Sequence, residues 1–279
     1  MKRFLSRAFQ LWMVLCCILT AGNAALAAQA PREPFKPKEG LAGKDAVWVP
    51  TPYAAVETML DLARVAPDDF VIDLGSGDGR NVIAAAKRGA RALGVEYNPD
   101  LVEFSKRAAA AAGVADRATF VQGDMFAADI SQATVLALFL LPENLVRLTP
   151  KFLALKAGTR IVANTFGIQG WYADESARTG DDCVMWCTAL LYIVPANVVG
   201  TWRLPQGELS LTQDFQMISG TLNTGGNSLP IENGRLRGNQ ISFAAGAADY
   251  VGRVSGDAME GEVKGGAPGT WTAIRASGK

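Results

Sequence analysis

Segments typical of strands and helices alternate between residues 47 and 195, and this alternation constrains the fold more than any other feature of the sequence. The expected strands are short apolar runs without polar alternation, at residues 70–74, 92–96, 118–121, 134–140 and 160–164. Helical segments lie between or before them, at 52–65, 81–88 and 99–112. This spacing predicts an α/β fold with a doubly wound, parallel, Rossmann-like sheet that is buried on both faces.

A glycine-rich loop follows the first expected strand and reads Asp73-Leu74-Gly75-Ser76-Gly77-Asp78-Gly79-Arg80. Glycine lets the backbone turn tightly and approach a ligand without an intervening Cβ. In open α/β sheets the ligand binds beyond the carboxyl ends of the strands, where this loop should lie. Asp73, Gly75, Ser76 and Gly77 are therefore expected to bind a ligand.

The next two expected strands end in acidic residues at the same edge of the sheet. Glu96 lies 21 residues after Gly75, and an acidic residue at that distance can accept hydrogen bonds from both hydroxyls of a ribose. Asp124 follows the third strand and can accept a hydrogen bond from the exocyclic amine of a base, while Met125 offers an apolar face to stack on it. The two strand ends predict a nucleoside site.

The spacing of the glycines favours S-adenosylmethionine over NAD. A dinucleotide site requires G-x-G-x-x-G, but Arg80 stands at the position of the third glycine here. Asp78 would place a carboxylate beside a pyrophosphate, whereas Asp73 suits the ammonium of a cofactor with an amino-acid tail.

Two stretches resemble a known family: VPTPYAAVETML at 49–60 and VIDLGSGDGRNVIAAAKRGARALGVEYNPDLVEFSKR at 71–107. Over about residues 47–172 the chain resembles class I S-adenosylmethionine-dependent methyltransferases. Within that class it is similar to the group of lysine methyltransferases that modify the ATP synthase c-subunit and the adenine nucleotide translocase. The resemblance implies S-adenosylmethionine as cofactor, protein-lysine N-methylation, and cofactor contacts at Asp73, Gly75, Gly77, Glu96 and Asp124.

The chain contains no histidine, which excludes a Ser-His-Asp hydrolase and an HExxH zinc site, and no metal site is predicted. Methyl transfer to an amine remains open, because alignment and desolvation supply much of its acceleration. Glu143 and Asn144 after the fourth strand and Asn164 at the end of the fifth are the candidate catalytic residues. Alternatively, Glu143 is only an acid favoured by the helix dipole.

Two aromatic residues and two cysteines follow the fifth expected strand. Trp171 and Tyr172 either wall a lysine channel through cation–π contact or pack on the core as a lid. Cys183 and Cys187 would lie ~13 Å apart on a strand, too far for a disulfide, so we expect them to be core residues of the last strands.

The expected acceptor is a lysine side chain of a protein, including a membrane-associated one. The N/D-P-P-Y/F motif that grips planar amides is absent after the fourth strand. Equal counts of 27 basic and 27 acidic residues argue against a nucleic-acid partner. A small-molecule N- or O-methyltransferase, or an exported nucleoside-binding protein without turnover, remain alternatives.

The two ends of the chain predict export and a second domain. Residues 1–27 have the basic start, apolar middle and A-x-A end of a signal peptide, so we expect a periplasmic protein, or one anchored in the membrane if this segment is not cleaved. Residues 28–46 are expected to be a linker. The methyltransferase domain should span 47–198.

Residues 199–279 predict a small antiparallel β-domain, either a barrel or a sandwich, because short alternating runs are separated by turn signals at 223–226 and 232–234. This region loosely resembles the G-x-W…S-G-x-L β-modules of exported bacterial proteins, with Gly200-Thr201-Trp202 at its start. Docking of the substrate or stabilisation is its expected role.

Overall fold

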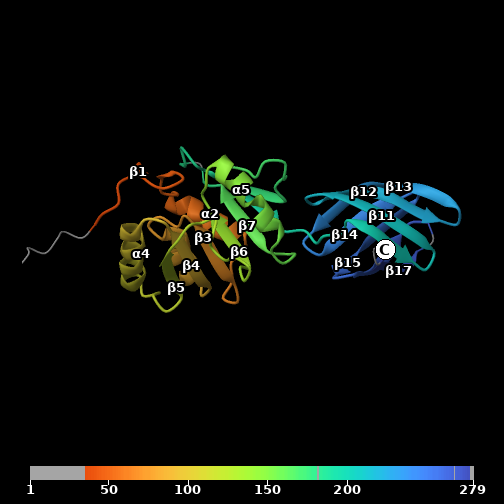
Figure 1. Ribbon diagram of the computed structural model, residues 1–279, viewed down its shortest axis with the longest axis horizontal. Helices are drawn as coiled ribbons and strands as arrows, with labels where there is room; N and C mark the ends of the chain where they lie inside the picture. The colour runs from red at the N-terminus through yellow and green to blue at the C-terminus, as the bar shows by residue number, and fades with distance from the viewer. Residues whose placement is uncertain (1–34, 181, 267, 277–279) are drawn as a thin grey trace, which may run out of the picture. The chain divides into compact units, whose positions relative to one another are not determined.

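A seven-stranded sheet forms the first part of the computed structural model, which describes residues 35–180, 182–266 and 268–276 (Figure 1). Its strands lie in the order β5 (Ala118–Gln122), β4 (Arg91–Glu96), β3 (Phe70–Leu74), β6 (Val135–Leu138), β7 (Arg160–Asn164), β9 (Thr188–Ile193) and β8 (Glu175–Arg178). The first five are parallel, which confirms the predicted fold. The sequence pattern did not predict β8. Strand β9 pairs antiparallel with β7, and β8 pairs antiparallel with β9.

Helices cover both faces of the sheet. Neighbouring residues of a strand point to opposite faces, and both faces carry apolar side chains that must be buried. The helices are α2 (Tyr53–Leu62), α3 (Arg80–Lys87), α4 (Pro99–Ala111) and α5 (Pro142–Leu153). Val71 belongs to the core on the side of α2, α3 and α4, whereas the adjacent Ile72 belongs to the core on the side of α5.

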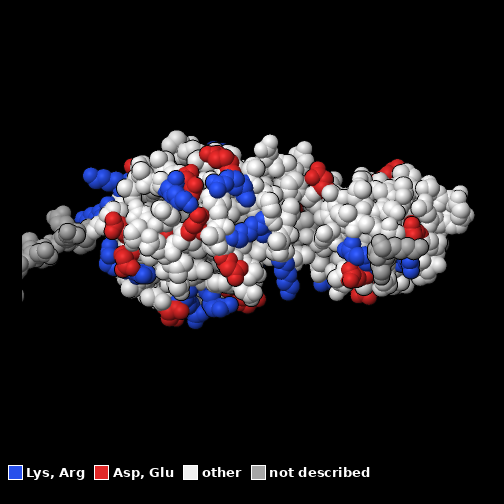
Figure 2. Space-filling model, in the orientation of Figure 1, with Lys and Arg blue, Asp and Glu red and all other residues white. Residues whose placement is uncertain are grey.

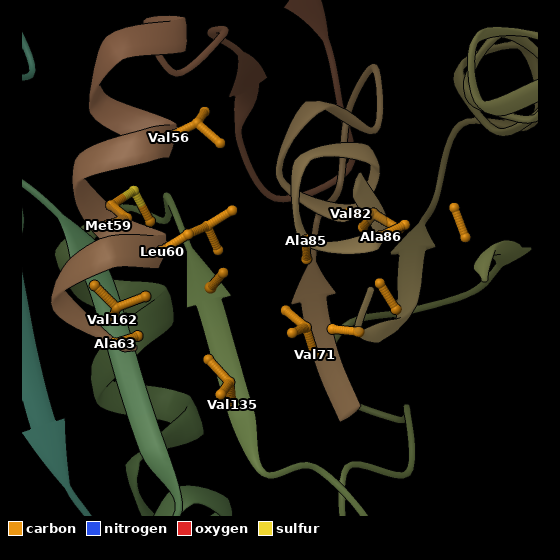
Figure 3. Close-up of a cluster of buried hydrophobic side chains, with 14 of the residues drawn as sticks. Val56, Met59, Leu60, Ala63, Val71, Val82, Ala85, Ala86, Val135 and Val162 are labelled. Carbon is orange, nitrogen blue, oxygen red and sulfur yellow. The ribbon is translucent and has the colours of Figure 1, made fainter. Parts of the chain in front are cut away.

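The period of α2 explains where it packs. Val56, Met59, Leu60 and Ala63 recur at i, i+3, i+4 and i+7, and all four are buried. Figure 3 shows them facing Val162 of β7 and Val135 of β6, beside the Val82, Ala85 and Ala86 side chains of α3. Each large side chain buried in this way contributes about 1.5–3 kcal/mol, so tertiary packing holds this ten-residue helix.

The second region is a closed antiparallel barrel, one of the two architectures predicted. Its strands follow one another as β10 (Gly200–Leu204), β11 (Gly207–Asp214), β12 (Met217–Thr224), β13 (Asn227–Arg237), β14 (Gln240–Ala245), β15 (Ala248–Ser255), β16 (Ala258–Lys264) and β17 (Gly269–Arg275). Pairing of Trp202 with Arg275 closes the ring. Closure leaves no free sheet edge, and alternate residues such as Leu209 and Leu211 fill the interior.

One predicted turn in the barrel is wrong. The Asn223–Gly226 segment does join β12 to β13, with positive φ at Gly225 and Gly226. Residues 232–234, expected to be a second turn, instead lie within the eleven-residue strand β13. Asn233 has a φ of 52°, and the pairing register shifts there. Asn-Gly pairs serve bulges as well as hairpin turns, so the local signal does not distinguish the two.

The segment before α2 folds over the sheet edge. Residues 41–46, expected to belong to a linker, contribute to a small hairpin in which β1 (Leu41–Ala42) pairs with β2 (Val47–Trp48). The predicted signal peptide, residues 1–27, lies outside the described residues. Within the described part of the chain, no helix has the length and apolar character needed to cross a membrane.

Candidate active site

The glycine loop turns back across the end of the neighbouring strand. The Gly75 and Ser76 amides donate to the Val95 carbonyl at 2.8 and 3.1 Å, and the Gly77 amide donates to Glu96 Oε2 at 2.9 Å. Gly77 has a φ of 55°, and a Cβ added there would lie 2.2 Å from Trp48 Nε1. Glycine suits this position because its φ is positive and because the Trp48 side chain packs directly against its backbone.

Glu96 is held in a fixed orientation by two backbone amides. Its Oε1 accepts from the Asn98 amide at 2.9 Å, and its Oε2 accepts from Gly77. Each carboxylate oxygen has a second lone pair, and Glu96 lines a cavity in front of the loop. The carboxylate is therefore positioned to accept the ribose hydroxyls that the sequence predicts.

The cavity has a volume of about 160 Å³ and brings together four of the predicted cofactor residues: Gly75, Glu96, Asp124 and Met125. A smaller cavity of about 30 Å³ is lined by Asp73, Ser76, Gly77 and Asn81. Both cavities are lined by Gly75 and Phe139, so they adjoin at these residues. Two adjoining spaces suit a ligand with a nucleoside part and an amino-acid part.

Asp73 lies in the smaller cavity and is 3% exposed. It accepts a hydrogen bond from Asn81 Nδ2 at 3.1 Å. Burial raises the pKa of the Asp73 carboxyl well above its usual value, and the nearby carboxylates of Glu96 and Asp78 raise it further. Ser76 Oγ and Asn81 Oδ1 are buried without a hydrogen-bond partner among the described residues. Unpaired buried polar atoms around a carboxylate fit the ammonium and carboxylate groups of a cofactor tail.

Asp78 does not act as the sequence argument assumed. Its carboxylate accepts from Arg80 Nε at 2.9 Å, and Arg80 also donates to the Thr51 carbonyl. The negative charge of Asp78 is thus neutralised by an ion pair and does not itself exclude a pyrophosphate. Two features distinguish this loop from a dinucleotide site. One is Arg80 at the third glycine position, and the other is the cradle, by which we mean Asp73 with the polar side chains of Ser76 and Asn81.

Residues 41–49, which we call the strap, cover the larger cavity. Lys44 Nζ donates to Asp124 Oδ2 at 2.6 Å and lies 5.3 Å from the Tyr97 ring centroid. This hydrogen bond and one from the Phe126 amide lower the pKa of Asp124, and the same contact with Asp124 raises the pKa of Lys44. Sequence analysis missed the strap because it has no apolar period; its signal is the Val47-Trp48 pair.

The three candidate catalytic residues do not line either of these cavities. Glu143 is an exposed residue in the first turn of α5, as the helix-dipole alternative predicts. Asn144 is buried and its amide lies 3.5 Å from the Asp45 carbonyl, at the limit of a hydrogen bond. Asn164 is buried at the end of β7, where its Oδ1 accepts from Thr165 Oγ1.

Neither Trp171 nor Tyr172 lines the two cavities, and Trp171 packs on the core, as the alternative expected of it. Trp171 is 3% exposed and stacks on Phe215 at 5.2 Å between centroids, while Tyr172 is 77% exposed. The cavity is walled instead by Phe139, Phe166 and Trp186. Phe139 and Phe166 follow the ends of β6 and β7, so the rule of strand ends identifies them, whereas Trp186 comes from the loop before β9.

Cys183 and Cys187 form a disulfide, with their Cα atoms 5.8 Å apart, which overturns the prediction of unpaired core residues. The prediction assumed an extended strand. The two cysteines lie instead in the loop before β9, where Trp186 has a φ of 60° and the chain turns back on itself. A turn brings Cα atoms four residues apart within the range that a disulfide spans.

Similarities to known proteins agree with this geometry. Residues 73–175 match the ANTKMT methyltransferase domain. A protein-lysine N-methyltransferase of Saccharolobus islandicus (strain REY15A) is 42% identical over 150 residues, which cover 53% of this chain and 92% of that protein. The Mus musculus lysine N-methyltransferase of the ATP synthase C-subunit is 37% identical over 49% of this chain, which spans only 56% of that protein.

A solved structure is similar over the same share of the chain. The crystal structure of an RNA methyltransferase from Salinibacter ruber in complex with S-adenosyl-L-homocysteine has 43% sequence identity and a TM-score of 0.50. The match covers 54% of this chain and 96% of that one. The solved structure contains S-adenosyl-L-homocysteine, and the names of the three proteins differ in the acceptor.

Proposed function

The chain belongs to the family of S-adenosylmethionine-dependent methyltransferases described by the ANTKMT methyltransferase domain, and we propose that its acceptor is the side-chain amine of a protein lysine. The observation that carries this proposal is the pair of adjoining cavities, which join Glu96 and Asp124 to the cradle around Asp73 beneath aromatic walls. The names of the Saccharolobus islandicus and Mus musculus relatives, both lysine methyltransferases, support the same acceptor.

The residues of the two cavities bind and orient the cofactor, which supplies a methyl group on a sulfonium when bound. Glu96 would accept from the ribose hydroxyls, Asp124 from the amine of the base, and Asp73 from the ammonium of the tail. The sulfonium of such a cofactor joins its nucleoside to its tail. The methyl group would therefore lie where the two cavities meet, beside Phe139.

The walls of the larger cavity would remove water from an entering lysine amine. Aromatic and aliphatic side chains make up most of its lining, and an apolar surrounding disfavours the charged form of an amine. The lysine nitrogen must be neutral to attack, because its lone pair forms the new bond. We therefore expect the rate to rise between about pH 7 and 9 as the amine deprotonates.

A protein acceptor is favoured over RNA by the charge of the surface. Figure 2 shows basic and acidic side chains interspersed on the visible face of the sheet region, and the net charge of the chain is zero. An RNA acceptor requires basic side chains to meet its phosphates. Exposed Tyr53, Val184 and Met185 line a shallow hollow next to the strap, which supports an apolar, membrane-associated acceptor.

Export to an oxidising compartment is part of the proposal. It is supported by the signal-peptide pattern of residues 1–27 and by the Cys183–Cys187 disulfide. Disulfides persist in the periplasm and other oxidising compartments, and they are rare in the cytosol. Fractionation of cells that express the full chain should place the protein in the periplasm; recovery in the cytosol with reduced cysteines would contradict export.

Partition of a radioactive methyl group tests the acceptor. The purified chain is incubated with labelled S-adenosylmethionine and a membrane extract, and the label is counted in protein, RNA and small molecules. We expect label in protein, and much less label with Glu96→Ala as the control at the same low donor concentration. Label in RNA or only in small molecules would contradict a lysine acceptor. Bound cofactor without any transfer would instead indicate a binding protein.

A further inference from the structure

We propose that Trp186, held by the Cys183–Cys187 disulfide, completes an aromatic box with Phe139 and Phe166 that binds the acceptor side chain. Binding of the acceptor, but not of the cofactor, then depends on the oxidised state of this disulfide. The inference rests on the proposed function, since it assigns the acceptor end of the same site. It is carried by the positions of three rings, one of which no regular element supports.

The three rings pack against one another. The Trp186 centroid lies 5.5 Å from that of Phe139 and 5.5 Å from that of Phe166, and the two phenylalanines are 6.1 Å apart. All three rings line the cavity that Glu96 and Asp124 also line. Because Phe139 borders both cavities, the box lies next to the expected position of the methyl group.

Two of the rings are positioned by the sheet. Phe139 directly follows β6 and Phe166 follows β7 by two residues, and these strands are paired in parallel. Their side chains therefore come to the carboxyl edge together, as strand-end residues do in this fold. Phe139 and Phe166 should stay in place whatever the state of the disulfide.

Trp186 depends on its loop. Its neighbours Val184 and Met185 are 93% and 61% exposed, so nothing packs over the tip of the loop within the described part of the chain. Backbone hydrogen bonds join Thr179 to Cys187 and Cys183 to Gly180 at the base. The disulfide is the covalent link between the two sides of the turn that contains Trp186. Breaking it returns conformational freedom to the turn, while the two backbone hydrogen bonds and the contacts of Trp186 with the two phenylalanines remain.

The chemistry of the transfer explains the use of such a box. The lone pair of the neutral lysine nitrogen forms a bond to the methyl carbon, while the carbon–sulfur bond breaks and its electron pair stays on sulfur. The product ammonium then releases a proton to water. Aromatic faces attract the ammonium that forms, and rings that displace water leave the attacking nitrogen desolvated.

Tetramethylammonium is a probe of the box that does not depend on turnover. The full chain is labelled with 5-fluorotryptophan, saturated with S-adenosylhomocysteine and titrated with tetramethylammonium chloride, and Trp186→Phe identifies the Trp186 fluorine resonance. We expect this resonance to shift on titration in the oxidised protein. Reduction should weaken probe binding about tenfold, as loss of a cation–π contact would. Affinity for S-adenosylhomocysteine should change less than twofold.

Matched variants separate the box from general effects. Cys183→Ser/Cys187→Ser should bind the probe as the reduced protein does and should not respond to reductant. Met217→Ala changes an exposed methionine that lines neither cavity and should leave probe binding unchanged. Equal probe affinity in the oxidised and reduced protein, or shifts only in other tryptophan resonances, would overturn the inference.

The inference and the proposed function fail in different ways. Probe binding that depends on the disulfide, without label on lysine, would count against the lysine acceptor alone. Lysine methylation with the same acceptor KM after reduction and in Trp186→Ala would count against the aromatic box alone.

Discussion

Ionisation of the buried Asp73 carboxyl destabilises the folded, ligand-free protein. Burial raises the pKa of its carboxyl well above the usual value. Between about pH 4 and that raised pKa, the folded protein keeps a proton that the unfolded chain has released. Stability therefore falls as pH rises through this window and is not reduced further above it. A bound ammonium would oppose this effect by favouring the ionised form.

Asp73→Asn should therefore raise the stability of the ligand-free protein at pH 8 while weakening cofactor binding. We expect Tm to rise by roughly 2–6 °C at pH 8, with a difference that shrinks toward pH 4. Calorimetric titration with S-adenosylhomocysteine should show at least tenfold weaker binding, because an amide cannot pair with an ammonium. A lower Tm at pH 8 would show that the carboxylate is not costly.

Glu96→Ala should remove the predicted ribose contacts, at a cost of about 2–3 kcal/mol in affinity for S-adenosylhomocysteine. Glu143→Ala is the matched control, since Glu143 is an exposed carboxylate outside both cavities. We expect its affinity and its rate to equal those of the wild type. Unchanged affinity in Glu96→Ala would disprove the ribose assignment, and a lost rate in Glu143→Ala would restore Glu143 as a catalytic candidate.

Sequence patterns identify site residues that sit at strand ends and miss those carried by loops. Gly75, Glu96 and Asp124 follow apolar runs, so their place at the carboxyl edge can be predicted from the alternation of strands and helices. Lys44 and Trp186 reach the same cavity from segments without periodicity. Their positions depend on a hairpin and a disulfide, which local propensity does not specify.

The strap is the element most directly coupled to the cofactor. Lys44 donates to Oδ2 of Asp124, the residue whose carboxylate is expected to accept from the amine of the base. Lys44→Met removes this competitor. We expect S-adenosylhomocysteine to bind roughly two- to fivefold more tightly at low salt, a factor of the size measured for exposed ion pairs. High salt should reduce the difference between variant and wild type. Weaker binding by the variant would mean that Lys44 contacts the cofactor directly.

Helices and buried strands could be predicted at the scale of elements, whereas some barrel strands could not. The amphipathic pattern of 52–65 contains α2, and the run 160–164 coincides with β7. The sequence of β16, Ala258–Lys264, gives a weak signal because its outer face is polar and Gly261 has no side chain to contribute. A Cβ at Gly261 would lie 2.0 Å from the Val251 carbonyl oxygen, so the barrel requires glycine where a strand pattern expects an apolar residue.

At the scale of the whole chain, residues after β7 contact the barrel. Trp171 stacks on Phe215, the Tyr172 carbonyl accepts from Gln216, and Arg235 pairs with Asp174 at 3.0 Å. Residues 36–279 form one compact unit. The predicted boundary near 198 means that residues 47–198 fold without the barrel, and this stays a prediction.

A chain that ends at Val198 tests that boundary. We expect it to bind S-adenosylhomocysteine within about threefold of the full chain, because Asp73, Glu96 and Asp124 all precede the cut. Its Tm should fall by roughly 5–10 °C, since Trp171 loses its cover. Arg235→Ala in the full chain is a milder control that should lower Tm by less. Aggregation without binding would mean that sheet and barrel share one core.

Amino-acid analysis of the methylated acceptor tests the central claim most directly. Membrane protein labelled by the purified enzyme from radioactive S-adenosylmethionine is hydrolysed in acid, and the amino acids are separated by chromatography. The account predicts that the label co-migrates with methylated lysine, at a rate that rises from about pH 7 to 9. Label that co-migrates with methylated arginine or histidine instead, or protein that stays unlabelled while the enzyme binds its cofactor, would contradict it.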